Sequence, residues 1–296
     1  MSVQLTVFTP TYNRAYILGR LYESLVGQTA DQFIWMIVDD GSTDETRSLV
    51  ASWVDEDLLD IQYVYKENHG MHSAHNVAFE NMDTPFMVCI DSDDFMPKDG
   101  VERILNNCKR IQNKSELAGV IGLDADKEGR VLGDPFPEAY TLGGVNEAKR
   151  KYGMTGDKKI VLKTDVVRQY PPYPLYEGER LVPLGTLYFM MERDYKFILT
   201  NEVFCNVEYM PDGSTRNILS QYRKNPNGFA YERRLRLAHD YGFLNLLKQW
   251  VHLISSCLFV KSIGPLKDAK RKYLLPLATP IGLLFHLYVR AKTSRP

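Results

Sequence analysis

The sequence predicts a Rossmann-like α/β protein: a mostly parallel central sheet with helices on both faces, followed by a C-terminal helical extension. Strand and helix patterns alternate over the first 125 residues. The expected strands are continuous apolar runs, which is typical of parallel strands buried on both faces. From about residue 216 onward, helical patterns replace strand patterns almost completely.

The first four strands and helices can be assigned in order along the chain. Apolar runs predict strands at residues 3–8, 33–38, 61–65 and 85–90. Segments with apolar residues at helical spacing predict helices at residues 14–26, 73–82 and 99–111, and another that ends at Trp53. Ser42 and Glu45 have the spacing of a capping box, so Ser42 is expected to cap that remaining helix.

Beyond residue 117 the regular alternation gives way to mixed fragments. Residues 117–123 and 130–132, joined by the polar turn 124–129, predict a hairpin. Fragments of both kinds continue to about residue 206, and a turn-rich segment follows. We therefore predict one domain over residues 1–215 and a helical region over residues 216–296.

The composition is that of an ordinary soluble globular protein, with 44% hydrophobic and 25% charged residues. Its four cysteines form no CxxC pair and lie among apolar neighbours, which indicates reduced, buried thiols in the cytoplasm. The net charge of −1 is uneven. Residues 241–296 contain nine Lys or Arg and one acid, a balance of +8, so the first 240 residues carry −9. An acidic body does not favour nucleic acid, and no such partner is expected.

The basic C-terminal region contains two apolar segments. Residues 243–260 are interrupted by Lys248, Gln249 and His252, and residues 273–289 by Pro276 and Pro280. A membrane-spanning helix needs about 20 clean apolar residues. We therefore expect peripheral contact with an anionic membrane, at the cytoplasmic face of the cell membrane. A helical pair packed on the core, or a true span, are the alternatives.

Three carboxylates follow the strand at residues 85–90: Asp91, Asp93 and Asp94. Like charges this close repel by roughly 1 kcal/mol per pair in water, so a compensating cation is expected. Alternation along an extended chain places Asp91 and Asp93 on one side, which suits a divalent ion such as Mn²⁺ or Mg²⁺. The alternative is a solvated acidic turn. A second Asp-x-Asp, Asp124 to Asp126, lies in the expected hairpin turn and is interpreted as structural.

A second acidic cluster, Asp39-Asp40-Gly-Ser-Thr-Asp44, follows another expected central strand. Ligands of parallel sheets bind at the carboxyl ends of the strands, so both clusters and residues 9–13 are expected to converge at one edge.

The motifs TPTYNR, VDDGSTDET and CIDSDDFMP, in this order and spacing, resemble the family 2 glycosyltransferases of the GT-A fold. The resemblance covers roughly residues 3–215 and extends to YEGER and YMPDGS, which are similar to a bacterial polysaccharide branch. It implies a nucleotide-diphospho-sugar donor, with UDP expected, a divalent metal, and inversion at the anomeric carbon. A QxxRW motif, which marks processive synthases, is missing, so one sugar is expected per encounter.

The resemblance also implies residue roles. Asp93 would ligate the metal, Asp91 would contact ribose or the metal, and Asp94 would support the metal site. The family's GGK lysine is absent from NHGM, so a diphosphate contact would fall to Gly70 and to His72; zinc at His72 and His75 is a remote alternative. The nucleoside pocket would be lined by Thr9, Pro10, Tyr12 and Arg14, with Asp39 bonded to the base.

Inverting transfer needs a carboxylate that removes the acceptor proton and does not bind the metal. Glu179, and in reserve Glu177, lie just before an apolar helical run; a carboxylate there can equally serve the helix dipole. The acceptor is expected to be a hydroxyl of a glycan or lipid-linked glycan. A non-catalytic sugar-nucleotide-binding scaffold and a sugar-phosphate nucleotidyltransferase are the rival functions, but the latter would open with a Gly-rich loop that TPTYNRAY lacks.

Overall fold

The computed structural model describes residues 4–208, 217–239 and 242–294. The chain forms two compact units. Unit 1 contains Met1–Pro172 and Leu187–Met210, and unit 2 contains Tyr173–Thr186 and Pro211–Pro296. The predicted boundary at residue 215 lies outside the described residues, as does most of the turn-rich YMPDGS segment. Tyr173–Thr186, which we had placed in the first domain, packs with the C-terminal helices.

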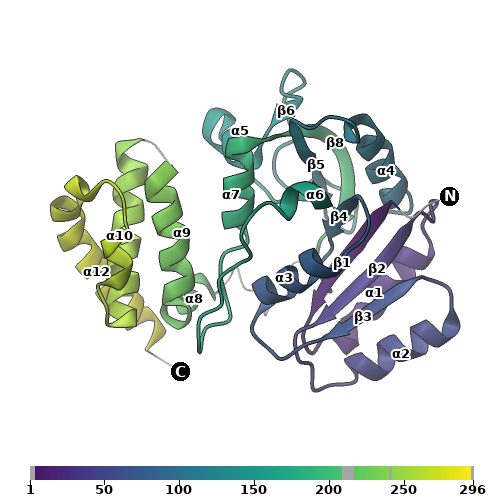
Figure 1. The fold of residues 1–296 in the computed structure, drawn as a ribbon, viewed down its shortest axis with the longest axis horizontal. Coiled ribbons are helices and arrows are strands. Elements are labelled where there is room, and N and C mark those ends of the chain that lie inside the picture. Colours follow the sequence, from purple (N-terminus) through teal and green to yellow (C-terminus); the bar gives the residue numbers. More distant parts are fainter. Residues whose placement is uncertain (1–3, 209–216, 240–241, 295–296) are drawn as a thin grey trace. The chain divides into compact units, whose positions relative to one another are not determined.

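Unit 1 is built on a mixed sheet, which has eight strands among the described residues (Figure 1). Their order is β3-β2-β1-β4-β7-β5-β8-β6. The strands are β1 (Leu5–Thr11), β2 (Phe33–Asp39), β3 (Ile61–Tyr65), β4 (Phe86–Cys89), β5 (Leu117–Ala125), β6 (Leu142–Gly143), β7 (Lys158–Lys163) and β8 (Lys196–Asn206). The four expected N-terminal strands all form.

Parallel pairing joins β3, β2, β1 and β4, as the continuous apolar runs predicted. The other half of the sheet differs, because β7 is antiparallel to both β4 and β5, and β6 to β8. The predicted hairpin forms only next to its turn. Ala125 and Val131 make an antiparallel bridge, and the amide of Leu132 donates to the carbonyl of Asp124 (2.8 Å), whereas most of β5 pairs with β7 and β8.

Helices cover both faces of the parallel half. The side chains of Val7, Trp35 and Val88, which share one face, form a core with α1, α2 and α4. On the opposite face, Phe8 packs edge-on against the ring of His75 from α3. Fully burying an aliphatic or aromatic side chain contributes about 1.5–3 kcal/mol, so this two-sided burial holds the strands in place. The helices of unit 1 are α1 (Ala15–Val26), α2 (Thr46–Glu56), α3 (Met71–Asn81), α4 (Gly100–Ile111), α5 (Val145–Tyr152), α6 (Thr164–Val167) and most of α7 (Gly185–Asp194).

Unit 2 is a helical bundle with its own core. Trp250, Leu253 and Ala278 are fully buried in it. Gly282 permits close helix packing, because a Cβ there would meet Ile254 at 2.9 Å. Among the described residues, two helical segments are long and apolar enough to cross a membrane by composition, Phe243–Val260 and Lys272–Thr293. The elements of the bundle are α8 (Ile218–Lys224), α9 (Pro226–His239), α10 (Phe243–Val260), α11 (Gly264–Lys267), the 3-10 turn η2 (Lys272–Leu274) and α12 (Leu275–Thr293).

Candidate active site

The candidate site lies where β1, β2 and β4 end. Thr11 is paired with Asp39, the last residue of β2, and the amide of Asp40 donates to the carbonyl of Thr11 (2.8 Å). On the other side of β1, the amide of Ile90 donates to the carbonyl of Phe8 (2.9 Å). Parallel pairing therefore brings the acidic segments after β2 and β4 to one edge of the sheet.

Asp39 is completely buried and both of its carboxylate oxygens accept hydrogen bonds. Oδ1 accepts from the amide of Ser42 (2.7 Å) and Oδ2 from the hydroxyl of Tyr63 (2.5 Å). Burial and the bond to Asp39 raise the pKa of the Tyr63 hydroxyl. Asp39 thus closes the turn after β2 and ties it to β3.

Asp40 holds the segment between β3 and α3. Its carboxylate pairs with the ammonium of Lys66 (2.6 Å) and accepts from the amides of His69 (3.0 Å) and Gly70 (2.7 Å). Gly70 has φ 93°, a conformation that favours glycine. The N–H of Gly70, expected to meet a diphosphate, donates to Asp40 here. The sequence pattern alone does not predict this role of Asp40.

The β1–α1 turn is fastened to the turn before α2. Asn13, at φ 53°, accepts at Oδ1 from the amide of Thr43 (2.7 Å), and its own amide donates to the hydroxyl of Ser42 (2.8 Å). The predicted capping box was therefore wrong. α2 begins at Thr46, whose amide donates to Asp44 (3.1 Å), and Ser42 serves the neighbouring turn.

The four residues expected around the nucleoside differ in exposure. The hydroxyl of Thr9 accepts from the indole N–H of Trp35 (2.9 Å) inside the core, and Pro10 is buried. Tyr12 is exposed, and Arg14, which contacts the hydroxyl of Tyr16, is half-buried. Only the latter pair therefore presents side chains to solvent.

Among the three carboxylates after β4, Asp94 is the buried one. Its Oδ2 lies 3.4 Å from the ammonium of Lys159, a buried residue of β7, and 3.7 Å from the thiol of Cys205. Burial raises the pKa of Asp94 to about 7; Lys159 opposes this rise, while the charges of Asp91 and Asp93 add to it. Part of the positive charge expected to compensate these three carboxylates is thus supplied by Lys159 of the chain itself.

The second Asp-x-Asp separates into two environments. Asp126 is a turn residue as predicted: it accepts from the amides of Glu128 (3.0 Å) and Arg130 (2.9 Å). Asp124 instead lies buried in β5, with its Oδ1 4.0 Å from the Lys159 ammonium. Assigning both residues to the turn was wrong for Asp124, because β5 continues to Ala125.

Asp91 and Asp93 are both partly exposed. Asp91 accepts a weak bond from the thiol of Cys89 (3.8 Å). Burial raises the pKa of the Tyr188 hydroxyl, and the charge of Asp91 adds to this rise. The carbonyl of Asp93 accepts from the guanidinium of Arg20, which fixes this turn. These two side chains can offer oxygen atoms to a ligand at the strand edge.

The carboxylates fit an open metal site better than a closed one. No group of three His, Cys, Asp or Glu side chains gathers for metal ligation among the described residues. Asp94 is directed to Lys159. Mg²⁺ is commonly held by one or two carboxylates together with substrate phosphates, and Asp91 with Asp93 can supply that number.

The two histidines of α3 are buried structural residues. Nδ1 of His75 donates to the carbonyl of Met71 (3.0 Å), and its ring packs on Phe8. Burial lowers the pKa of His72 to about 4, partly opposed by Asp40. A helix-face role therefore suits both better than zinc.

Glu179 and Glu177 belong to unit 2. The carboxylate of Glu179 accepts three hydrogen bonds at the start of α9: two from the backbone and side chain of Asn227 (2.9 and 2.8 Å) and one from the amide of Gly228 (2.9 Å). It satisfies helix N–H groups that have no partner within the helix. Glu177 is exposed.

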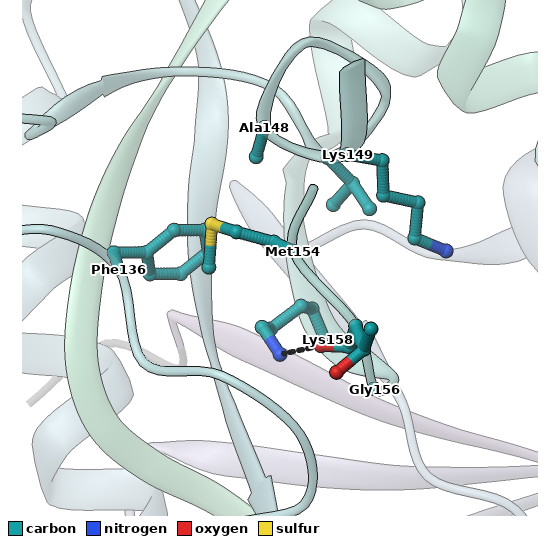
Figure 2. A pocket seen from close by; sticks show the side chains of 8 residues that line it. Phe136, Ala148, Lys149, Met154, Gly156 and Lys158 are labelled. Carbon is teal, nitrogen blue, oxygen red and sulfur yellow. Dashed lines mark hydrogen bonds between the residues drawn. The ribbon is translucent and has the colours of Figure 1, made fainter. Parts of the chain in front are cut away.

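A small pocket of unit 1 lies between α5 and the segment before β7 (Figure 2). Phe136 and Met154 line it, and Lys158 donates to the carbonyl of Thr155 (3.1 Å) at its rim. Its volume of about 10 Å³ is near the minimum for one water molecule, so it cannot hold a nucleotide.

Solved structures define the class to which this fold belongs. S. aureus TarS, residues 1–349, matches 99% of this chain and 92% of its own, with a TM-score of 0.57 and 15% identity. The mannosyltransferase PcManGT from Pyrobaculum calidifontis, solved with GDP-Man and Mn²⁺, matches 99% of this chain and 84% of its own, with a TM-score of 0.55 and 17% identity. The fold is therefore that of the GT-A glycosyltransferases, as predicted.

The model of glycosyl transferase family 2 matches residues 6–162, more than half of the chain. The protein belongs to this family and has a nucleotide-sugar-binding fold. It is 28% identical over 139 residues to glycosyltransferase GlyA of Streptococcus pneumoniae serotype 4, covering 46% of this chain and 20% of GlyA. It is 40% identical over 92 residues to validoxylamine A glucosyltransferase of Streptomyces hygroscopicus subsp. jinggangensis, covering 30% and 21%. The matched segment is thus about a fifth of each relative.

Proposed function

We propose that this protein is an inverting, metal-dependent glycosyltransferase that moves a sugar from a nucleotide-diphospho-sugar, with UDP as the expected nucleotide, to a hydroxyl of a glycan or lipid-linked glycan. The acidic end of β4 carries the proposal. Lys159 is one positive charge facing Asp94 and Asp124. Asp91 and Asp93 add negative charge beyond it, at the edge where parallel sheets bind ligands. A divalent cation with a diphosphate would balance that charge.

Asp93, together with Asp91, would hold Mn²⁺ or Mg²⁺, with diphosphate oxygens completing the coordination. A bound ion supplies Lewis-acid stabilisation of the departing diphosphate. Asp94 would support this site from inside, by fixing the turn against Lys159. PcManGT, which shares the fold, was solved with Mn²⁺ and supports this assignment.

The nucleoside would lie against the β1–α1 turn. Tyr12 and Arg14 would contact it through their side chains, whereas Thr9 and Pro10 would form the floor through the backbone. Asp39 would accept from the base with an oxygen that also accepts from Ser42 or Tyr63, since each carboxylate oxygen has two lone pairs. Gly70 would shape the diphosphate side while bonded to Asp40.

The catalytic base would be a glutamate of the segment Tyr173–Thr186. Three hydrogen bonds occupy Glu179 at the start of α9, which favours a structural role for it. We therefore place Glu177, whose side chain is exposed, first and Glu179 second. Glu177→Gln should bind donor normally and lose turnover by roughly 10²–10⁴-fold. Normal turnover in Glu177→Gln would return the role to Glu179.

We further propose that the protein works in the cytoplasm, in peripheral contact with the anionic inner face of the cell membrane. The balance of +8 over residues 241–296 supports such contact.

Calorimetry of UDP binding with and without Mn²⁺ tests the donor site. The wild type should bind more tightly with Mn²⁺, and Asp93→Ala should lose this gain; equal affinity in all four measurements would contradict the metal-dependent proposal. A thermal-shift panel of nucleotide-sugars then selects the donor, because tight ligands stabilise the folded state by mass action. Transfer or hydrolysis of that donor excludes a non-catalytic scaffold, and release of inorganic pyrophosphate with a sugar phosphate and UTP would indicate a nucleotidyltransferase.

A further inference from the structure

The outward face of α12 is apolar along nearly its whole length. Leu277 is 50% exposed, Leu284 68% and Leu287 58%. The sequence contains no charged residue between Lys272 and Arg290. The other exposed large apolar residues of this face are Ile281, Leu283 and Tyr288, and exposed Tyr273 lies just before the helix, in η2. Soluble monomers rarely expose a continuous apolar patch of this kind, so the face is expected to be covered in the working protein.

The opposite face of α12 already has its partner. Ala278, Gly282, His286 and Val289 are buried, at the spacing of a single helix face. A Cβ on Gly282 would meet Ile254 of α10 at 2.9 Å, so the two helices are in close contact. The exposed leucines are therefore a second, separate face of the helix.

Basic residues flank the apolar face at both ends, and no acid lies between residue 269 and the C-terminus. Lys270, Arg271 and Lys272 precede the apolar stretch, and Arg290 and Lys292 follow it. Apolar side chains framed by cations complement a lipid surface with anionic headgroups.

We propose that the outward face of α12 docks flat on an anionic lipid bilayer, with Leu277, Leu284 and Leu287 inserted and the basic ends at the headgroups. This deepens the membrane contact proposed above, but it does not depend on sugar transfer. A span is disfavoured because α12 also packs on α8, which ends in Arg223 and Lys224. Arg223 of α8 donates to the carbonyl of Thr293 at its end (3.0 Å).

A second copy of the chain is a poorer occupant of this face. Pairing two α12 helices in parallel would place like basic ends together, and antiparallel pairing would place residues 270–272 beside 290–292 of the other copy. Both arrangements bring cations together, which is unfavourable, whereas anionic lipid neutralises them.

Vesicle co-sedimentation of the full chain tests the proposal, with phosphatidylcholine vesicles and vesicles that contain about one-third phosphatidylglycerol. Wild type should bind the anionic vesicles, and salt should release it. Leu287→Glu should bind at least tenfold more weakly. Leu58→Glu is the matched control, because Leu58 lies in unit 1 and is 59% exposed against 58% for Leu287. It should bind as the wild type does.

Several results would overturn the docking surface. These are no binding by the wild type, equal binding by Leu287→Glu, equal binding to both kinds of vesicle, resistance to alkaline extraction, or a dimer in solution that Leu287→Glu dissociates. Circular dichroism checks that Leu287→Glu is folded. Sugar transfer to a soluble acceptor without vesicles is measured alongside, so failure of membrane docking is distinguishable from failure of the proposed activity.

Discussion

At the end of β2, Asp39 and Asp40 are surrounded by donors from the neighbouring segments. All four of their carboxylate oxygens accept hydrogen bonds, mostly from backbone amides, a tyrosine hydroxyl and Lys66. At the end of β4, Asp94 is held inside by Lys159, while Asp91 and Asp93 remain partly exposed. The carboxylates at the end of β2 therefore hold the following turns in place. Those of Asp91 and Asp93, after β4, stay partly exposed at the edge of the sheet.

The difference lies in residues far from either motif. Tyr63 in β3 and Lys66 just after it contact the carboxylates at the end of β2. Lys159 in β7 contacts Asp94 at the end of β4. An acidic strand end is therefore a better candidate ligand site where its carboxylates stay accessible to solvent than where the rest of the fold buries them among donors. Four predictions, from the largest expected effect to the smallest, test this contrast.

Asp93→Asn should lower transfer by about 10³-fold, because several kcal/mol of charge stabilisation would be lost at about 1.4 kcal/mol per tenfold change. The melting temperature should stay near that of the wild type, since Asp93 is partly exposed. Asp126→Asn, in the other Asp-x-Asp, is the matched control and should keep its activity. An equal loss in both variants would sink the assignment of Asp93.

Lys159→Met should destabilise the fold by about 3–5 kcal/mol, because it leaves Asp94 and Asp124 buried without their cation. Lys163→Met is the control: Lys163 is equally buried in β7 but donates to the carbonyl of Lys114, and its loss should cost about 1 kcal/mol. Urea unfolding measures both. If Lys159→Met does not fold, adding Asp94→Asn and Asp124→Asn should restore folding; failure of that rescue would contradict the pairing.

His72 should make the first strand end sensitive to acid. Its pKa is about 4 in the folded protein, below the ordinary 6.5, so the unfolded chain binds more protons between these values. The contribution of His72 to stability is complete above pH 6.5 and decreases by up to about 3 kcal/mol as the pH falls to 4. Unfolding at several pH values should show a smaller pH slope for His72→Gln than for the wild type or for exposed His69→Gln. Identical slopes would exclude this role.

Asp40→Asn should cost about 1–3 kcal/mol, because it removes the charge facing Lys66 and leaves a donor of residues 66–70 without an acceptor. Exposed Asp60→Asn should have no measurable effect on the free energy of unfolding. If Asp40→Asn abolished transfer while stability was unchanged, the contrast between the two strand ends would be wrong.

Local patterns predicted the parallel half of the fold well. Residues 61–65 form β3 with the expected bounds, and helices follow β1 and β3 as expected, because apolar periodicity there coincides with burial. The predictions failed where a distant partner decides. The hydroxyl of Ser42 accepts a hydrogen bond from the amide of Asn13 instead of capping α2. Similarly, β5 pairs with strands 40 to 80 residues further along the chain.

The sequence pattern predicted the acidic residues of the candidate site, but not the lysine that faces two of them. Lys159 belongs to the run KKIVLK, whose lysines look like ordinary surface residues. Alternation along β7 places Lys159, Val161 and Lys163 on one side, and Val161 indicates that this side is buried, but only the antiparallel pairing with β4 and β5 shows which acids it meets.

The chain enters unit 2 at residue 173, returns to unit 1 at residue 187 and leaves again after residue 210. Glu179, on the inserted segment, holds the start of α9, and a Cβ on Gly228 would clash with the carbonyl of Leu181 at 2.1 Å. A chimaera that exchanges only the residues after 210 would therefore separate α9 from Glu179, which caps it. Exchanging unit 2 as a whole by recombination would need three crossover sites, one on each side of this short insertion and one after residue 210.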